Sequence, residues 1–251
     1  ITLSNLVSGE ALNHSGTATI SSANAGSYTI TNLAGITIAD GSGGTASNYT
    51  LTGGTHNFTT NQRPVNATLA RQYDGTTNAA GFDLSSFDAL QGGETLTLSG
   101  SGSAANDNVA NGISVSSLGT LALINGTGLA SNYSLNSAVI NITQRVLNSS
   151  GSKAYDANTN ALAADITLSN LVSGETLNHS GTASISSANA ASYTITNLAG
   201  ITLADNAGLA SNYTLTGGTH NFTVNPKVIS LSGTRLYDAT TDAVASDLTT
   251  I

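Results

Sequence analysis

Internal repetition constrains this chain of 251 residues more than any other feature. The sequence of residues 1–40 returns at residues 166–205 with four differences, and a Tyr-Asp pair recurs every 82 residues, at Tyr73, Tyr155 and Tyr237. A period of 82 residues is too long for one coil of a solenoid, whereas it suffices for a small domain. The repetition therefore predicts a tandem array of similar domains.

The Tyr-Asp pairs and the short stretches before them set the boundaries of the copies. We predict four copies: residues 1–62, which lack the first strand, then 63–144, 145–226 and the truncated 227–251. Pro64 and Pro226 lie at two of the three junctions, and almost no spacer separates successive copies. Because proline restricts φ, we expect semi-rigid junctions and a stiff rod. Both chain ends lie inside a repeat, so we expect the array to continue in a longer protein.

Composition and alternation predict β-structure in every copy. Ser, Thr, Asn and Gly make up about half of the chain, and the helix formers Glu, Gln, Lys, Arg and Met are scarce. Residues 27–31, 48–59 and 94–100 alternate apolar and polar side chains, as half-buried strands do. We predict an all-β fold in which each copy is a small β-sandwich-like domain of five to seven short strands, without a helix longer than a turn. A β-grasp-like sheet is the alternative architecture.

Charge and composition exclude several classes of function. Fourteen Asp and Glu residues outnumber six Lys and Arg residues, and the net charge is −8. Binding to nucleic acid or to an anionic membrane surface needs the opposite balance. The chain has no run of about 18 apolar residues that could span a bilayer. It also contains no cysteine, which excludes disulfides and thiolate chemistry.

The histidines are predicted to be packing residues. They align with aliphatic residues of the second copy: His14 and His179 with Leu98, and His56 and His220 with Ile140. A position that is Leu or Ile in a sister domain is a partly buried packing position. A zinc site would need three or four converging ligands, and the chain offers no local pair of histidines. Metal ligation is therefore the weaker interpretation, and we expect no cofactor.

The Tyr-Asp pairs admit two interpretations. A corner that presents a tyrosine and a carboxylate can bind a sugar or calcium. We favour an Asx-turn, in which Asp74, Asp156 or Asp238 caps its own backbone while the preceding tyrosine packs behind it. Calcium requires several carboxylates and carbonyls in one loop, and Asp107 is the nearest approach to such a loop.

All six basic residues occupy two positions of the repeat. They lie ten and two residues before a Tyr-Asp tyrosine: Arg63, Arg145 and Lys227 at the first position, and Arg71, Lys153 and Arg235 at the second. Both offsets are even, so in an extended strand the cations share the face of the tyrosine. We favour edge protection and local pairing with Asp. The alternative is a ligand-binding cationic stripe for acidic polysaccharide or a neighbouring rod.

The ordered motifs of one period resemble a known repeat. YDGTT at residues 73–77 is followed by GETLTLSG at 93–100, by AANDNVANG at 104–112 and then by an SNY segment that runs into the last strand. This set resembles the YDG/MBG-type repeats of filamentous-haemagglutinin-like bacterial surface proteins of the two-partner secretion kind. The resemblance implies a secreted or surface-attached adhesin or biofilm-matrix protein of a Gram-negative bacterium, with the repeats as its stalk.

The function expected from these features is structural and adhesive. We predict the extracellular stalk of a large adhesin, with lectin-like glycan-binding repeats or the subunit of a self-assembling fibre as alternatives. The expected partners are a host or neighbouring cell surface, matrix polysaccharide, or the protein itself. No Gly-x-Ser-x-Gly elbow or other nucleophile motif is present, so we predict that the chain is not an enzyme.

Overall fold

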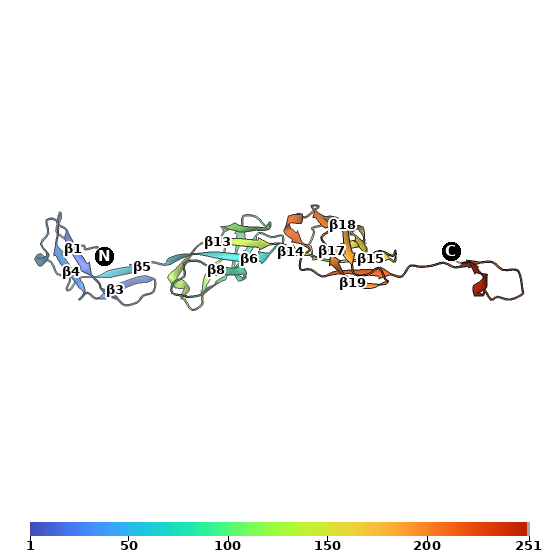
Figure 1. The fold of residues 1–251 in the computed structure, drawn as a ribbon. Coiled ribbons are helices and arrows are strands. Elements are labelled where there is room, and N and C mark those ends of the chain that lie inside the picture. The colour runs from blue at the N-terminus through green and yellow to red at the C-terminus, as the bar shows by residue number, and fades with distance from the viewer. Residues whose placement is uncertain (250–251) are drawn as a thin grey trace. The chain divides into compact units, whose positions relative to one another are not determined.

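The computed structural model describes residues 1–249, and these residues form strands, loops and short 3₁₀ turns (Figure 1). Among them there is no α-helix, and each 3₁₀ turn contains three residues. The predicted all-β fold without a helix longer than a turn is thus confirmed. Within the same residues, no helix has the length and apolarity that a membrane span requires.

The chain divides into two units, whose boundaries differ from those of the sequence copies. Unit 1 contains residues 1–71 and 76–143, whereas unit 2 contains residues 72–75 and the chain from residue 144 onward. Residues 72–75 hold the first Tyr-Asp pair. This short segment therefore belongs to unit 2, although its neighbours in sequence belong to unit 1.

Unit 1 contains the strands of the first two copies. The strands of residues 1–62 are β1 (Leu12–Gly16), β2 (Thr19–Ile20), β3 (Gly26–Asn32), β4 (Ile36–Asp40) and β5 (Asn57–Thr60). The strands of the second copy are β6 (Arg63–Gln72), β7 (Asn78–Ala80), β8 (Leu84–Phe87), β9 (Leu96–Ser99), β10 (Ser101–Ala104), β11 (Ala110–Ser117), β12 (Ala122–Asn125) and β13 (Tyr133–Thr143). The 3₁₀ turns are η1 (Ala46–Asn48), η2 (Gly81–Asp83) and η3 (Ala130–Asn132).

Unit 2 contains the third copy and the residues that follow it. The strands of the third copy are β14 (Arg145–Val146), β15 (Asn148–Ala154), β16 (Asn160–Leu162), β17 (Ile166–Ser169), β18 (Asn178–Ile185), β19 (Ala191–Asn197), β20 (Ile201–Ala204), β21 (Tyr213–Thr214) and β22 (His220–Asn225). Beyond them lie β23 (Ser232–Gly233) and β24 (Leu248–Thr249). The 3₁₀ turns are η4 (Ala163–Asp165), η5 (Ala210–Asn212) and η6 (Ala245–Asp247).

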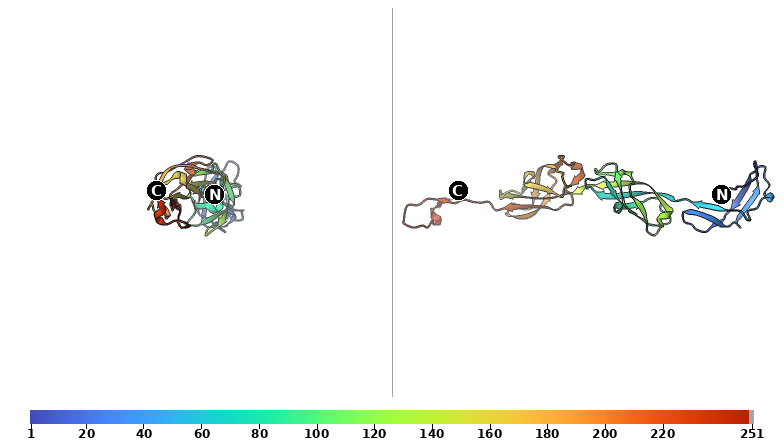
Figure 2. Two further views of the ribbon diagram at one scale, coloured as in Figure 1. Left: turned by 90° about the vertical axis from the view of Figure 1, so that its right-hand side faces the viewer. Right: turned by 180° about the vertical axis from the view of Figure 1, so that it is seen from behind.

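The second and third copies share one sheet topology. The strand order is β7-β10-β11-β13-β6-β8 in the second copy and β16-β18-β19-β22-β15-β17 in the third, so corresponding strands occupy corresponding places. In the third copy, β15 runs parallel to β22 and antiparallel to β17. The sheets of each unit curl, as the front and rear views show (Figure 1, Figure 2).

Alternation along the strands builds the core of each copy. In β6, Val65, Ala67 and Leu69 are buried, while the side chains between them are more exposed. In β22, Phe222 and Val224 are buried and pack with three isoleucines and two alanines of the same copy. Successive side chains of a strand point to opposite faces, which explains this period of two. Each core therefore consists of a small number of apolar side chains.

Two sequence expectations need correction. The second and third copies contain eight and nine strands instead of five to seven, because several strands of two to four residues form between the loops. The alternation of residues 48–59 predicts a strand, but only β5 forms, at the end of that range. Gly53 has a φ of 83°, and the turn that it makes interrupts the range before β5 begins at Asn57. The second copy lacks this Gly-Gly turn, and its equivalent residues form the single long strand β13.

Candidate functional site

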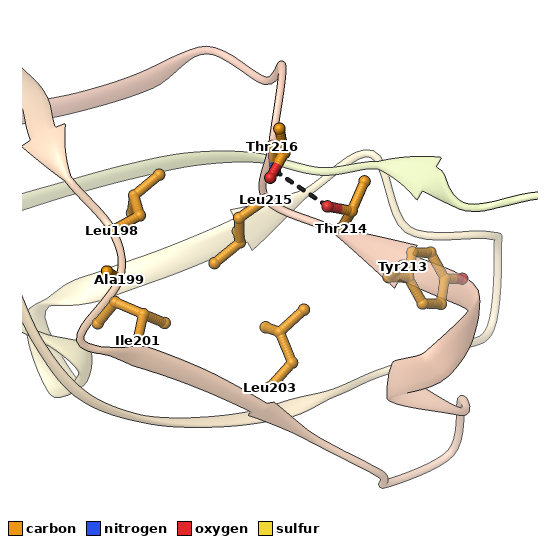
Figure 3. Close-up of a pocket in the computed structure, with 8 residues that line it drawn as sticks. All are labelled: Leu198, Ala199, Ile201, Leu203, Tyr213, Thr214, Leu215 and Thr216. Atoms are coloured by element: carbon orange, nitrogen blue, oxygen red, sulfur yellow. Dashed lines mark hydrogen bonds between the residues drawn. The ribbon is translucent and has the colours of Figure 1, made fainter.

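A hollow of about 450 Å³ opens beside β20 and β21 (Figure 3). Its lining residues are Leu198, Ala199, Ile201, Leu203, Tyr213, Thr214, Leu215 and Thr216. The polar side chains among them carry hydroxyls alone, and Thr214 Oγ1 already accepts a hydrogen bond from the Thr216 N–H at 3.1 Å. The Tyr213 hydroxyl donates to Glu175, which does not line the hollow. The lining thus supplies contact surface but no acid, base or metal ligand.

The same hollow recurs in the first copy. There its volume is about 420 Å³, and its lining is Leu33, Ala34, Ile36, Ile38, Tyr49, Thr50, Leu51 and Thr52. These residues occupy the same positions of the repeat as those around the hollow of the third copy. The hollow therefore recurs in the first and third copies, whose sequences nearly coincide.

Three of the four histidines lie where the packing interpretation predicts, whereas for His14, which is exposed, the interpretation is wrong. His220 is buried, its Nδ1 is 2.9 Å from Ser149 Oγ, and its Nε2 is 2.8 Å from the Leu215 carbonyl oxygen. His179 is half-buried, with its Nε2 at 2.9 Å from the Ile166 carbonyl oxygen. His56 is also half-buried and bonds the Leu51 carbonyl, whereas His14 is exposed. Among residues 1–249, no three His, Asp or Glu side chains gather as a metal site requires.

Two of the Tyr-Asp pairs begin Asx-turns, as the sequence predicts for Asp156 and Asp238. Asp156 Oδ1 accepts a hydrogen bond from the Asn158 N–H at 3.2 Å, and Asp238 Oδ1 accepts one from the Thr240 N–H at 3.0 Å. We call the segments that begin at Tyr73, Tyr155 and Tyr237 the Tyr-Asp turns. Asp107 is half-buried in the loop between β10 and β11.

The cations two residues before each tyrosine hold these turns together. Each donates to the backbone carbonyl three residues beyond the tyrosine: Arg71 to Thr76, Lys153 to Asn158, and Arg235 to Thr240. Lys153 also pairs with Asp156 at 2.9 Å, and Arg235 pairs with Asp238 at 3.4 Å. The Lys153 ammonium lowers the pKa of the Asp156 carboxyl through its hydrogen bond. The predicted local pairing with Asp therefore occurs in these two turns.

The cations ten residues before the tyrosine hold a different loop. Arg63 Nε donates to the Ala89 carbonyl oxygen at 2.5 Å, and Arg145 Nε donates to the Asn170 carbonyl oxygen at 2.6 Å. Ala89 and Asn170 have positive φ values of 57° and 69°, so each arginine fixes a loop at its left-handed residue. Lys227 is exposed, and its ammonium bonds no residue between 1 and 249. The six cations thus do not present one row of free charges, and a ligand-binding stripe stays a prediction.

A recurring pair of glutamate and tyrosine is the polar cluster that the sequence analysis missed. In each copy the tyrosine hydroxyl donates to the glutamate carboxylate: Tyr49 to Glu10, Tyr133 to Glu94, and Tyr213 to Glu175. In each copy the same hydroxyl also accepts a backbone N–H at 3.1 Å, from Val7, Gln91 or Val172. We call these the Glu-Tyr pairs. A Glu that precedes a Tyr by 38 or 39 residues in three copies was the sequence signal for them.

The pair of the third copy receives a second tyrosine. Tyr73 donates its hydroxyl to Glu175, and its ring meets the Tyr213 ring edge-to-face, with centroids 5.5 Å apart. Burial, followed by the bond to Glu175, raises the pKa of Tyr213 to about 12. The same two causes, in the same order, raise the pKa of Tyr73. One carboxylate, that of Glu175, thus accepts both phenols, Tyr73 at Oε1 and Tyr213 at Oε2.

A comparison with protein families assigns the repeat. The model of the YDG domain matches residues 59–141 and, again, residues 140–222. The chain belongs to the YDG domain family. Two YDG domains therefore stand in tandem at the period that the sequence predicts, which confirms the YDG part of the resemblance. No curated protein and no solved structure matches the chain.

Proposed function

We propose that these YDG domains form the extracellular stalk of a large bacterial surface or biofilm-matrix adhesin of the filamentous-haemagglutinin-like, two-partner secretion kind. In this role the region is secreted by, or attached to, a Gram-negative cell and has structural and adhesive tasks instead of a catalytic one. Its partners are a host or neighbouring cell surface, matrix polysaccharide, or further copies of the protein.

One observation carries the proposal: with the exception of Lys227, the recurring cations and the glutamates of the Glu-Tyr pairs bind within their own unit. The cations hold turns and loops, the glutamates hold tyrosines, and the buried histidine holds a serine. A repeated ligand site would instead direct several recurring polar groups into a cavity. Domains of this kind add length when they are copied, which is what a stalk requires.

Single-molecule stretching of the full chain tests the structural task. One copy of 82 residues, extended by at most about 3.6 Å per residue, can release roughly 30 nm of chain. We expect force peaks separated by nearly this length, one for each YDG domain that the chain contains. A chain that extends without such peaks would contradict a stalk that transmits force.

Binding to acidic polysaccharide at low and high salt tests the adhesive task. We expect weak binding that high salt abolishes, because the contacts available are exposed cations. Lys227→Gln should weaken this binding, since Lys227 is exposed, whereas Lys153→Gln is the matched control at a largely buried cation. Equal effects of the two variants would argue against a contribution from surface cations.

The recurring hollow favours lectin-like repeats as the second candidate. It is the same in two copies and is open to solvent next to Tyr49 or Tyr213. Sugar sites usually stack the sugar on an exposed aromatic ring, whereas Tyr213 is buried. Tight, salt-insensitive binding of one glycan by the full chain, lost in Leu203→Asp and retained in Lys227→Gln, would establish the lectin-like function in place of the stalk.

A further inference from the structure

The three Tyr-Asp turns share their local chemistry but differ in the exposure of their tyrosines. Tyr73 is 4% exposed, Tyr155 is 38% exposed and Tyr237 is 93% exposed. In each turn the preceding cation holds the same carbonyl position, so the turn itself does not bury the tyrosine. The burial of Tyr73 must come from groups that are distant in sequence.

Those groups belong to the Glu-Tyr pair one repeat further along the chain. Within unit 2, the Tyr73 hydroxyl bonds Glu175, and its ring packs edge-to-face on Tyr213 at an interplanar angle of 82°. The buried Asn212 side chain bonds the same tyrosine. Arg145 donates to the Tyr73 carbonyl oxygen at 3.4 Å. Side chain and backbone of this tyrosine are therefore both bound by the repeat that follows it.

The turn also fits its surroundings by shape. Gly75 has a φ of 73°, and a Cβ atom at this position would lie 2.8 Å from Val172 Cγ1. The Val172 N–H, in turn, donates to the Tyr213 hydroxyl at 3.1 Å. The third residue of the Tyr-Asp turn thus contacts the loop that carries the Glu-Tyr pair. Tyr73 and Gly75 of one turn therefore both contact the site around the Glu175–Tyr213 pair.

The other Glu-Tyr pairs have the same geometry but do not receive a second tyrosine among residues 1–249. In Glu10–Tyr49 and Glu94–Tyr133, the tyrosine hydroxyl is bonded by the carboxylate and by a backbone N–H, as it is in Glu175–Tyr213. One oxygen of each of these two carboxylates accepts the tyrosine, and the described residues place no hydrogen bond on the other. The site that Tyr73 occupies is therefore formed by each copy itself.

We propose that the Tyr-Asp turn is a docking element whose partner is the Glu-Tyr pair of the following copy of the same repeat. Tyr73 occupies such a pair in this chain, and Tyr155 offers its phenol at the same repeat position to a further copy, with Ala157 where the first turn has Gly75. The phenol supplies a hydrogen-bond donor for the free carboxylate oxygen and an edge for the ring of the paired tyrosine. This inference rests on the proposed stalk, because it names the contact by which one repeat recognises the next.

Hydrogen exchange of the full chain, measured by mass spectrometry, tests the proposal. Tyr73→Ala should accelerate amide exchange in residues 172–176 and 212–214 by about tenfold or more, because these residues lose a hydrogen bond and a ring contact. Tyr73→Phe, which keeps the ring, should give a smaller acceleration in the same segments. Tyr155→Ala is the matched control: it alters the same position of the next turn and should leave both segments unchanged.

A double-mutant cycle separates docking from a general loss of stability. The effects of Tyr73→Phe and Glu175→Gln on exchange should be coupled, whereas those of Tyr155→Phe and Glu175→Gln should multiply independently. Unchanged exchange in Tyr73→Ala, or an equal change in Tyr155→Ala, would overturn the proposal. Force peaks at the repeat length would persist in that case, so a failure of docking can be told from a failure of the stalk.

Discussion

Replacing His220 by isoleucine should destabilise the third copy, although the second copy carries Ile140 at the same position. His220 Nδ1 and Ser149 Oγ share a hydrogen bond of 2.9 Å, and both side chains are buried. Isoleucine would leave the serine hydroxyl buried without this partner, which costs about 1–3 kcal/mol. The second copy avoids this cost because Ala67 occupies the serine position.

The double variant Ser149→Ala with His220→Ile should recover most of that loss. It reproduces the residues of the second copy, where Ala67 and Ile140 are buried on the neighbouring strands β6 and β13. Replacing both partners of a buried hydrogen bond by apolar groups of suitable shape is nearly neutral. Exchange rates of peptides from β15 and β22 give the local free energy of opening for the wild type, both single variants and the double variant.

His56 serves as the control for His220, because it is the equivalent histidine of the first copy. His56→Ile should be tolerated, because His56 is half-buried and its imidazole bonds only the Leu51 carbonyl among the described residues. If the two replacements at Ser149 and His220 lower the free energy of opening additively, the reasoning from a shared hydrogen bond is refuted.

Three further predictions concern the core, a turn and alkaline pH. Phe222→Ala should lower the free energy of unfolding by about 3–5 kcal/mol, because Phe222 is 0% exposed, whereas Phe58→Ala should cost clearly less at 39% exposure; urea titration of both variants measures the difference. Gly181→Ala should destabilise unit 2, because its Cβ would lie 1.9 Å from the Gly200 carbonyl oxygen at a φ of 102°; Gly174→Ala, with a φ of 88° and open space, should melt closer to the wild type. Because the pKa of Tyr213 is raised to about 12 from an unfolded value near 10, the folded state holds this proton more tightly. Its contribution to stability is therefore present below about pH 10 and is lost as the pH rises towards 12. Thermal melting across this range should show a smaller loss in Glu175→Gln, and an identical loss would contradict the assignment.

Alternation along the chain predicts much of this fold, and aligned positions in different copies allow each prediction to be compared with a second sequence. The alternation of residues 27–31 and 94–100 corresponds to β3 and β9, and the alignment of His220 with Ile140 predicts a packing position that proves to be buried. Pairing of Lys153 with Asp156 was predictable from their separation of three residues. Each of these features depends on residues that are close in sequence or aligned between copies.

The remaining features depend on contacts between residues that are distant in sequence. Arg145 fixes Asn170 at a left-handed backbone position, which no local pattern announces. The sequence predicts that Tyr73 packs behind its own turn. Tyr73 instead bonds Glu175, which is 102 residues away in the chain. The Gly-Gly turn at Gly53 interrupts a range that alternation alone would make one strand, and β5 begins only at Asn57. Chain topology, rather than propensity, determines these contacts.

The parallel pairing of β15 with β22 determines how a YDG domain responds to tension. β15 lies near the start of the third copy and β22 at its end, and Ser149 to Ala154 pair in register with His220 to Asn225. A pull on the two ends of the domain therefore acts along these strands in opposite directions. Their hydrogen bonds are loaded in shear and must break together, instead of unzipping one after another. In this fold the first and last long strands of the domain lie side by side in parallel. All the hydrogen bonds between β15 and β22 therefore oppose the extension together.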